Sequence, residues 1–124
     1  MDPVVALADV RRMAMSLPDT EVDASGNRFS VRGTGLAWPF PERVHPKRAR
    51  VERLDIFVVR VADEGDQQAM LAGEPEKYFT TDHYNGYPAV MIRLAAISAT
   101  ELTELLMDAH EAACRKRPRP RRTR

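Results

Sequence analysis

Apolar residues recur every three or four positions near the start of the chain. One stripe at helical spacing is formed by Leu7, Val10, Ala14 and Leu17. Asp2 followed by Pro3 is typical of a helix start, because aspartate caps free backbone N–H groups and proline suits the first helical position. Pro18 ends the pattern. We therefore predict a helix from Asp2 to the residue before Pro18, and then a polar, acidic loop over 19–27.

Alternating apolar and polar positions predict strands in the middle of the chain. Phe29 and Val31 alternate with polar neighbours, and a glycine-containing turn over 32–35 leads to a returning strand over 36–38. The β-branched run 55–61 is the strongest strand candidate. Further strand signals lie over 78–81 and 89–94. Between these strands, the backbone of 39–53 is expected to be irregular because it is broken by Pro39, Pro41 and Pro46.

Two more helices are predicted, and together the elements indicate an α+β fold. A short helix spans 63–72 and is ended by Gly73. Ser98 with Glu101 forms a capping box that opens a last helix, whose core side carries Leu102, Leu105, Leu106, Ala109 and Ala113. We expect one compact domain over 1–114, with an antiparallel sheet of about four to five strands. The N-terminal and C-terminal helices would pack on one face, with the short helix inserted.

The net charge of +1 conceals a strong asymmetry. Residues 1–114 contain 12 basic and 18 acidic side chains, a net of −6, whereas 115–124 contain seven basic and no acidic ones. Pro118 and Pro120 oppose a helix in this tail, so we expect it to be extended and mobile. Such tails often meet nucleic acid or anionic surfaces, although a purely solubilising terminus has the same composition.

Basic residues also gather within the domain. One group surrounds His45 and consists of Arg43, Lys47, Arg48, Arg50 and Arg53. Period-two alternation would bring a second group from three strands onto the sheet face away from the helices: Arg28, Arg32, Arg60 and Arg93. These nine residues are the candidate nucleic-acid site, since guanidinium groups suit phosphate oxygens. The alternative is that the arginines of the sheet face are scattered and paired with nearby carboxylates.

The segment 78–94 resembles the signature of the MmcQ/YjbR family of small bacterial proteins. It contains Tyr-Phe, a short threonine-containing link, His-Tyr, a variable residue, Gly-Tyr-Pro, and an apolar strand ending in Arg-Leu. The resemblance extends over about residues 3–114. It implies a secretion-chaperone or frataxin-like α+β fold and the DNA-binding label common in that family, with no catalytic residues. This chain differs in its longer basic segment 39–53 and its basic tail, which both favour polyanion binding.

The loop within this signature has two interpretations. Its candidate ligand-facing or interaction residues are His83, Tyr84, Asn85 and Tyr87. In the first interpretation the loop is a packed corner that sets strand register. In the second, its rings form a shallow surface on which bases or another ligand stack.

Most catalytic and membrane classes find no support in the sequence. There is no GxGxxG, P-loop, GxSxG or HExxH motif, and no acid/base pair is evident. His110 and Cys114 share a helix face but are too few for a zinc site, so we expect no metal and no cofactor. No secretory signal or membrane span is recognisable, and one cysteine suits a reducing cytoplasm.

These observations predict a cytoplasmic, non-enzymatic DNA-binding protein of the MmcQ/YjbR type. Its binding would be driven by phosphate contacts and weakly sequence-specific. The alternative is a protein-interaction or small-ligand-binding module that uses the open sheet face and the tyrosine loop. The oligomeric state, any partner and the preferred DNA are not determined by the sequence.

Overall fold

A computed structural model describes residues 5–81, 84 and 86–115. Its strands form one antiparallel sheet in the order β1-β2-β3-β4-β6-β5. The strands are β1 (Thr20–Val22), β2 (Phe29–Val31), β3 (Thr34–Glu42), β4 (Val51–Arg60), β5 (Tyr78–Phe79) and β6 (Ala89–Arg93). The helices are α1 (Leu7–Met15), α2 (Glu64–Gly73) and α3 (Ala99–Arg115), with a short 3-10 turn at Leu94–Ala96.

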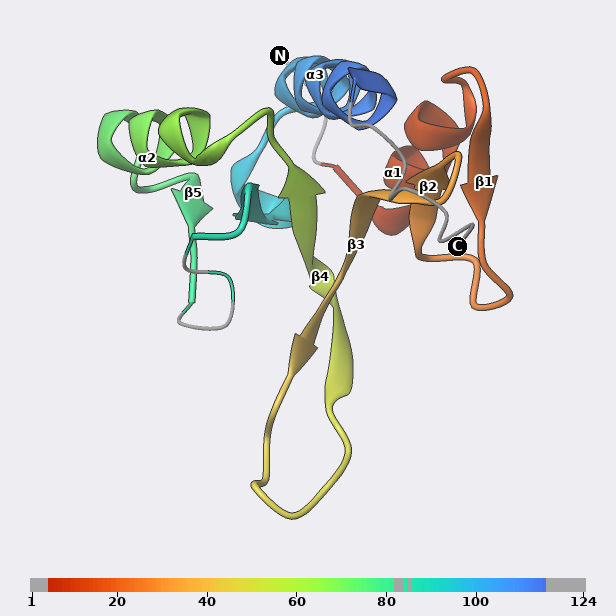
Figure 1. Ribbon diagram of the computed structural model, residues 1–124. Coiled ribbons are helices and arrows are strands. Elements are labelled where there is room, and N and C mark those ends of the chain that lie inside the picture. Colours follow the sequence, from red (N-terminus) through yellow and green to blue (C-terminus); the bar gives the residue numbers. More distant parts are fainter. Residues whose placement is uncertain (1–4, 82–83, 85, 116–124) are drawn as a thin grey trace, which may run out of the picture.

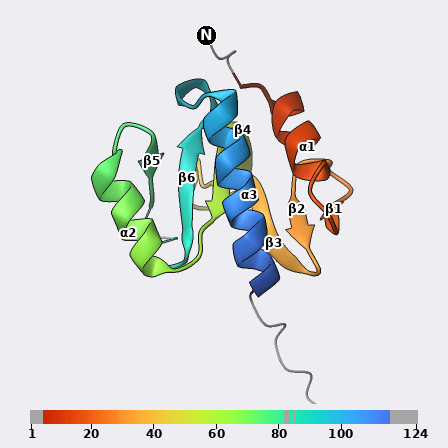
Figure 2. The same cartoon turned by 90° about the horizontal axis from the view of Figure 1, so that it is seen from above.

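Helices α1 and α3 lie side by side over one face of the sheet, as predicted, and α2 lies beside the β5–β6 edge (Figures 1 and 2). The main core fills the space beneath α1 and α3. It includes Val10, Phe29, Phe57, Ile92 and Leu106, all nearly inaccessible to solvent. The α+β class, the single domain and the helices sharing one face are therefore confirmed, with six strands in place of the four to five expected.

Hydrogen bonds cap both α2 and α3 at their starts, although Gly73, expected to follow the short helix, is the last residue of α2. Ser98 and Glu101 cap α3 reciprocally: the Glu101 N–H donates to Ser98 Oγ at 3.1 Å, and the Ser98 N–H donates to Glu101 Oε1 at 2.9 Å. Asp63 caps α2 by accepting from the Asp66 N–H at 2.8 Å. Helix α3 ends at Arg115, the first residue of the predicted basic tail. The rest of the predicted tail lies outside the described residues.

The start of the first helix is corrected. Helix α1 begins at Leu7, because the Asp9 carboxylate accepts from the Ala6 N–H at 2.9 Å and caps the helix there. Val5 precedes the helix and is buried in the main core. The expected start at Asp2 and Pro3 lies outside the described part of the chain.

The predicted loop over 19–27 is also corrected, since it contains strand β1. This strand pairs only with β2, and Glu21 and Val22 are exposed. An edge strand of this kind has little periodic burial, so the hydrophobic pattern did not reveal it. Between β2 and β3, the turn residues Arg32 and Gly33 have φ angles of 51° and 83°, which are typical of a tight two-residue hairpin.

The largest correction concerns residues 39–53, where strands β3 and β4 continue as a hairpin with a register shift between Pro39 and Phe40 and a loop over 43–50. Strands β3 and β4 continue past the sheet, with Pro41 opposite Glu52 and Glu42 opposite Val51. Strand β2 pairs no further along β3 than Ala37, so Pro39 and Pro41 lie where one edge of β3 is open and a missing N–H is tolerated. Figure 1 shows this hairpin projecting away from the helices. We call residues 40–53 the arm.

Candidate nucleic-acid interface

The end of the arm carries four basic side chains that have no carboxylate partner among the described residues: Arg43, Lys47, Arg48 and Arg50. The segment 43–50 contains no acidic residue and is exposed throughout. Its position at the far end of the projecting hairpin separates these charges from the acidic body (Figure 1). We call this segment the arm tip. It is a concentrated positive surface that is open to a polyanion.

Hydrogen bonds hold the arm tip in a defined shape. The Arg48 N–H donates to the His45 carbonyl at 3.1 Å, and the Lys47 N–H donates to His45 Nδ1 at 3.1 Å. One nitrogen of Arg43 reaches the carbonyls of Pro46 and Arg48 at 3.2 and 3.3 Å. These bonds order the turn and use no carboxylate, so the charge of Arg43 stays uncompensated. Arg50 donates in the same way to the Pro41 carbonyl at 3.1 Å.

Arg53, at the base of the arm, differs from the tip residues. It binds Asp55 with two nitrogens at 3.0 and 2.8 Å, and its third nitrogen binds Glu42 at 3.0 Å. The hydrogen bond with Asp55, and then the one with Glu42, raises the pKa of Arg53 further above its usual value. Because two carboxylates surround this guanidinium, Arg53 adds little positive potential. It belongs to the shaft of the arm rather than to the candidate interface.

The four arginines predicted for one exposed sheet face are not gathered there. Arg28 pairs with Glu52 at 3.1 Å, and Arg32 pairs with Asp19 at 2.9 Å. Arg93 stacks on Phe79, with its guanidinium carbon 4.1 Å from the ring centroid. Arg60 is only 5% exposed, so the expectation that it faces solvent is wrong. The structure therefore separates the nine candidate residues into a free group at the arm tip and an engaged group on the body.

Arg60 is buried because it binds the tyrosine loop to the sheet. Its Nε donates to the Gly35 carbonyl at 2.5 Å, and its Nη2 donates to the Tyr87 hydroxyl at 3.1 Å. The guanidinium also lies 5.7 Å from the centroid of the Tyr87 ring, within the range of a cation–π contact. An arginine held in this way is a structural element of the fold. It offers no free positive charge to a ligand.

Aromatic rings continue this packed corner on the sheet face opposite α1 and α3. Trp38 Nε1 donates to the Tyr84 hydroxyl at 3.0 Å, and the rings of Trp38, Tyr84 and Tyr87 lie 5.9–6.4 Å apart. Trp38 also lies against Gly35, where a Cβ would come within 2.8 Å of the indole ring. This second apolar cluster includes Ile56, Val58, Ala89 and Met91.

The described part of the tyrosine loop is thus mainly architectural. Tyr84 is buried, and Tyr87 is 39% exposed with its hydroxyl already bonded to Arg60. His83 and Asn85, the other two candidates of this loop, lie outside the described residues.

Gln67 of α2 is a structural residue that no pattern in the sequence singles out. It is completely buried, and its Nε2 donates to the carbonyls of Tyr84, Tyr87 and Ala89 at 3.2, 2.8 and 2.8 Å. These bonds join α2 to the tyrosine loop. A glutamine within a weakly amphipathic helix carries no local signal for such a role. Its importance is evident only once the loop is placed beside it.

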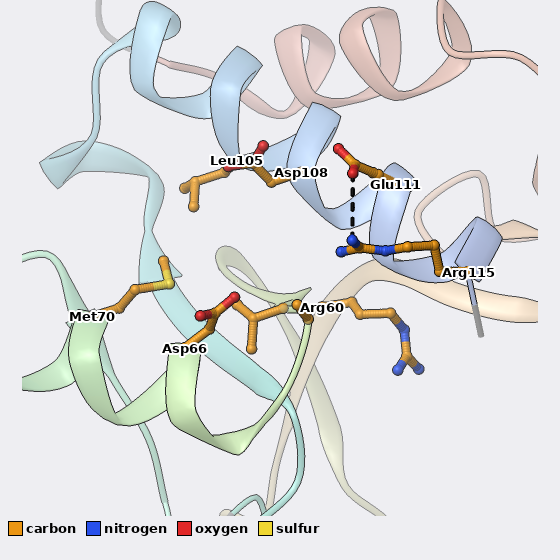
Figure 3. Close-up of a pocket in the computed structure, with 9 residues that line it drawn as sticks. Arg60, Asp66, Met70, Leu105, Asp108, Glu111 and Arg115 are labelled. Atoms are coloured by element: carbon orange, nitrogen blue, oxygen red, sulfur yellow. Dashed lines mark ion pairs between the residues drawn. The ribbon is translucent and has the colours of Figure 1, made fainter.

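A cleft of about 280 Å³ lies between α2 and α3. Its acidic lining residues are Asp66, Asp108 and Glu111, and Glu111 pairs with Arg115 at 3.5 Å. Figure 3 shows that the guanidinium of Arg60 points away from these carboxylates. The cleft is therefore acidic on balance and unsuited to phosphate. It is separate from the arm tip.

Curated relatives of this chain occur in mycobacteria. One is from Mycobacterium tuberculosis and another from Mycobacterium bovis, and both are described only as uncharacterized proteins. Each is 41% identical over 107 residues, in an alignment that covers 82% of this chain and 82% of the relative. The chain belongs to their family. Membership in this mycobacterial family supplies no activity, so any functional argument rests on the geometry above.

Other comparisons add little to this family assignment. No protein-family model and no solved structure matches the chain.

Among the described residues, no helix is both long and apolar enough to span a bilayer. The same residues contain no group of three or more histidine, cysteine or carboxylate side chains placed to hold a metal ion. Nδ1 of His110 lies 3.8 Å from the sulfur of Cys114, and its Nε2 donates to the Pro18 carbonyl at 2.7 Å.

Proposed function

We propose that this protein binds DNA through the arm tip, by phosphate contacts and with little sequence preference. The observation that carries the proposal is the group of four basic side chains that project from the body with no carboxylate partner among the described residues. Guanidinium and ammonium groups bind phosphate oxygens without reading base sequence. Two-stranded ribbons are also among the elements that bind in the major or minor groove of DNA.

The resemblance of 78–94 to the MmcQ/YjbR signature supports the same function, because DNA binding is the label common in that family. The proposal assigns no catalytic step to the protein. It includes a cytoplasmic location, since a chain with one cysteine suits a reducing compartment.

A matched pair of double variants tests the proposal. Lys47→Ala with Arg48→Ala removes two charges from the arm tip, where neither side chain bonds to another described group. Arg28→Ala with Arg32→Ala removes two charges that are paired on the body. Fluorescence anisotropy with a labelled DNA duplex gives the affinity at several salt concentrations. Circular dichroism checks that both variants are folded.

We expect the arm-tip variant to bind more weakly and to lower the slope of log affinity against log salt by about two, since each lost phosphate contact removes about 0.9. The body variant should keep nearly the wild-type slope. Equal losses in the two variants would contradict a local site. A chain ending at Arg115 should still bind, and loss of all binding on this truncation would assign the DNA contact to 116–124 instead.

A second function is favoured by one observation. An open groove of about 500 Å³ lies at the β1–β3 end of the sheet, and its lining includes Glu21, Arg28 and Trp38. A peptide or small ligand could bind there, as in the alternative interaction module. Trp38 is the single tryptophan, so its fluorescence reports on this groove. If the protein fails to bind DNA even at low salt, ligands that shift Trp38 emission become the ones to pursue.

A further inference from the structure

The arm tip carries exposed apolar side chains as well as positive charge. Val44 is 69% exposed, more than any other large apolar side chain that the structure describes. Pro46, two positions further on, is also exposed. Both lie among Arg43, Lys47 and Arg48. These apolar groups are exposed to solvent and lie among the cations at the end of a projecting hairpin.

The positions of the charged and apolar groups suit a distorted DNA duplex. Proteins that enter the minor groove often insert small apolar side chains between base pairs, which unstacks one step and bends the helix. Flanking basic residues hold the phosphates on both sides of that step. In this arm, Arg43 precedes Val44 and Lys47 follows Pro46, so a cation adjoins each end of the apolar pair.

The arm tip is also ordered in a way that suits insertion. The turn is closed by the bond from the Arg48 N–H to the His45 carbonyl, and Arg43 spans it through the carbonyls of Pro46 and Arg48. Insertion of a side chain into the base stack requires unstacking of a few kcal/mol per step. A turn that is already ordered loses less conformational entropy on binding than a flexible loop would, so the total cost of insertion is lower.

We propose that Val44, with Pro46, is an apolar wedge that enters the minor groove of duplex DNA and kinks it while the surrounding cations hold the backbone. This inference rests on the proposed function. It specifies that the ligand is duplex DNA and that binding bends the duplex. Bending of roughly 20–90° is the range produced by such wedges. The wedge contributes to the shape of the complex, whereas phosphate contacts contribute most of the affinity.

The test compares Val44→Ser with Val51→Ser, a second exposed valine on the shaft of the arm at 52% exposure. A duplex of about 30 base pairs carries a donor and an acceptor dye at its ends, so that energy transfer reports bending. A second duplex carries 2-aminopurine, whose fluorescence rises when a base unstacks. Anisotropy on the same samples gives the affinity.

Wild type should raise both the energy transfer and the 2-aminopurine signal. Val44→Ser should lose most of both increases while its affinity changes less than about threefold, because phosphate contacts dominate affinity. Val51→Ser should behave as wild type. Binding by wild type without bending or unstacking would overturn the wedge and leave the proposed function intact. Equal bending by Val44→Ser would also overturn the wedge, and absence of binding by wild type at low salt would overturn both proposals.

Discussion

The arm tip and the tyrosine corner both contain arginines that the sequence offers as DNA ligands, but their environments are opposite. At the arm tip, Arg43 and Arg50 bond only to carbonyl groups, and the side chains of Lys47 and Arg48 bond to no described group. At the corner, Arg60 is buried against Gly35 and Tyr87. The comparison shows that a basic residue can serve a ligand only where the fold leaves its side chain exposed to solvent.

The comparison divides the variants into two classes. Variants of the tyrosine corner should lower the stability of the protein and leave its DNA affinity unchanged. Variants of the arm tip should lower the DNA affinity and leave the stability unchanged.

Gln67→Leu should have the largest effect on stability. It removes the amide that donates to three carbonyls in a fully buried position, so unfolding should become easier by about 3 kcal/mol. Urea denaturation followed by circular dichroism measures this change. Gln68→Leu, on the exposed side of the same helix, is the control and should stay within about 0.5 kcal/mol of wild type. Equal stability of the two variants would show that Gln67 does not secure the loop.

Arg60→Met should have the next largest effect on stability. The substitution keeps much of the side-chain length but leaves the Gly35 carbonyl and the Tyr87 hydroxyl without their donor, at a cost of about 2 kcal/mol. Urea midpoints give the stability, and anisotropy with duplex DNA should give an unchanged affinity. A stable variant that has lost DNA binding would reverse the roles assigned to the two regions.

The ion pair between Lys77 and Glu101 should make a smaller, pH-dependent contribution. The Lys77 ammonium, and then the Ser98 N–H, lowers the pKa of Glu101 below 4.5. Glu101 raises the pKa of Lys77 above 10.5. The stabilisation is therefore fully present between these two values. It is lost as the pH falls through the lowered pKa of Glu101 or rises through the raised pKa of Lys77.

Glu101→Gln tests this dependence and retains an acceptor for the cap of α3. The difference in unfolding free energy between wild type and variant should shrink at pH values below 4.5. Glu104→Gln, on the exposed side of the same helix, should show no such trend. A difference that is independent of pH would exclude the ion pair as its source.

Single surface substitutions should have the smallest effect on stability. They therefore separate residues that bind DNA from residues that do not most clearly. Arg32→Ala breaks an exposed pair with Asp19 and should change the stability little, because solvent screens the attraction. Arg48→Ala should change stability by less than about 0.5 kcal/mol. In the DNA assay only Arg48→Ala should weaken binding. If both weaken it equally, the total charge of the protein determines affinity and the arm tip has no special role.

Features that depend on residues close together in the chain could be predicted from the amino-acid sequence. The cap of α3 joins Ser98 to a residue three positions away, and the alternation at Phe29 and Val31 assigns one side of a strand to the core. Such signals act within one turn or one strand. For this reason the α+β class, the presence of the three helices and most strand positions could be predicted without knowledge of the fold.

Only the tertiary structure decided which charges remain available. Arg60 reaches Gly35, 25 positions away, and Tyr87, 27 positions away. The prolines of 39–41 are local strand breakers, yet they fit a strand because its partner β4 pairs on one edge and the other edge is open. Pairing, burial and projection from the body all depend on contacts between distant segments. The sequence therefore identified nine candidate cations, and the fold left four of them free at the arm tip.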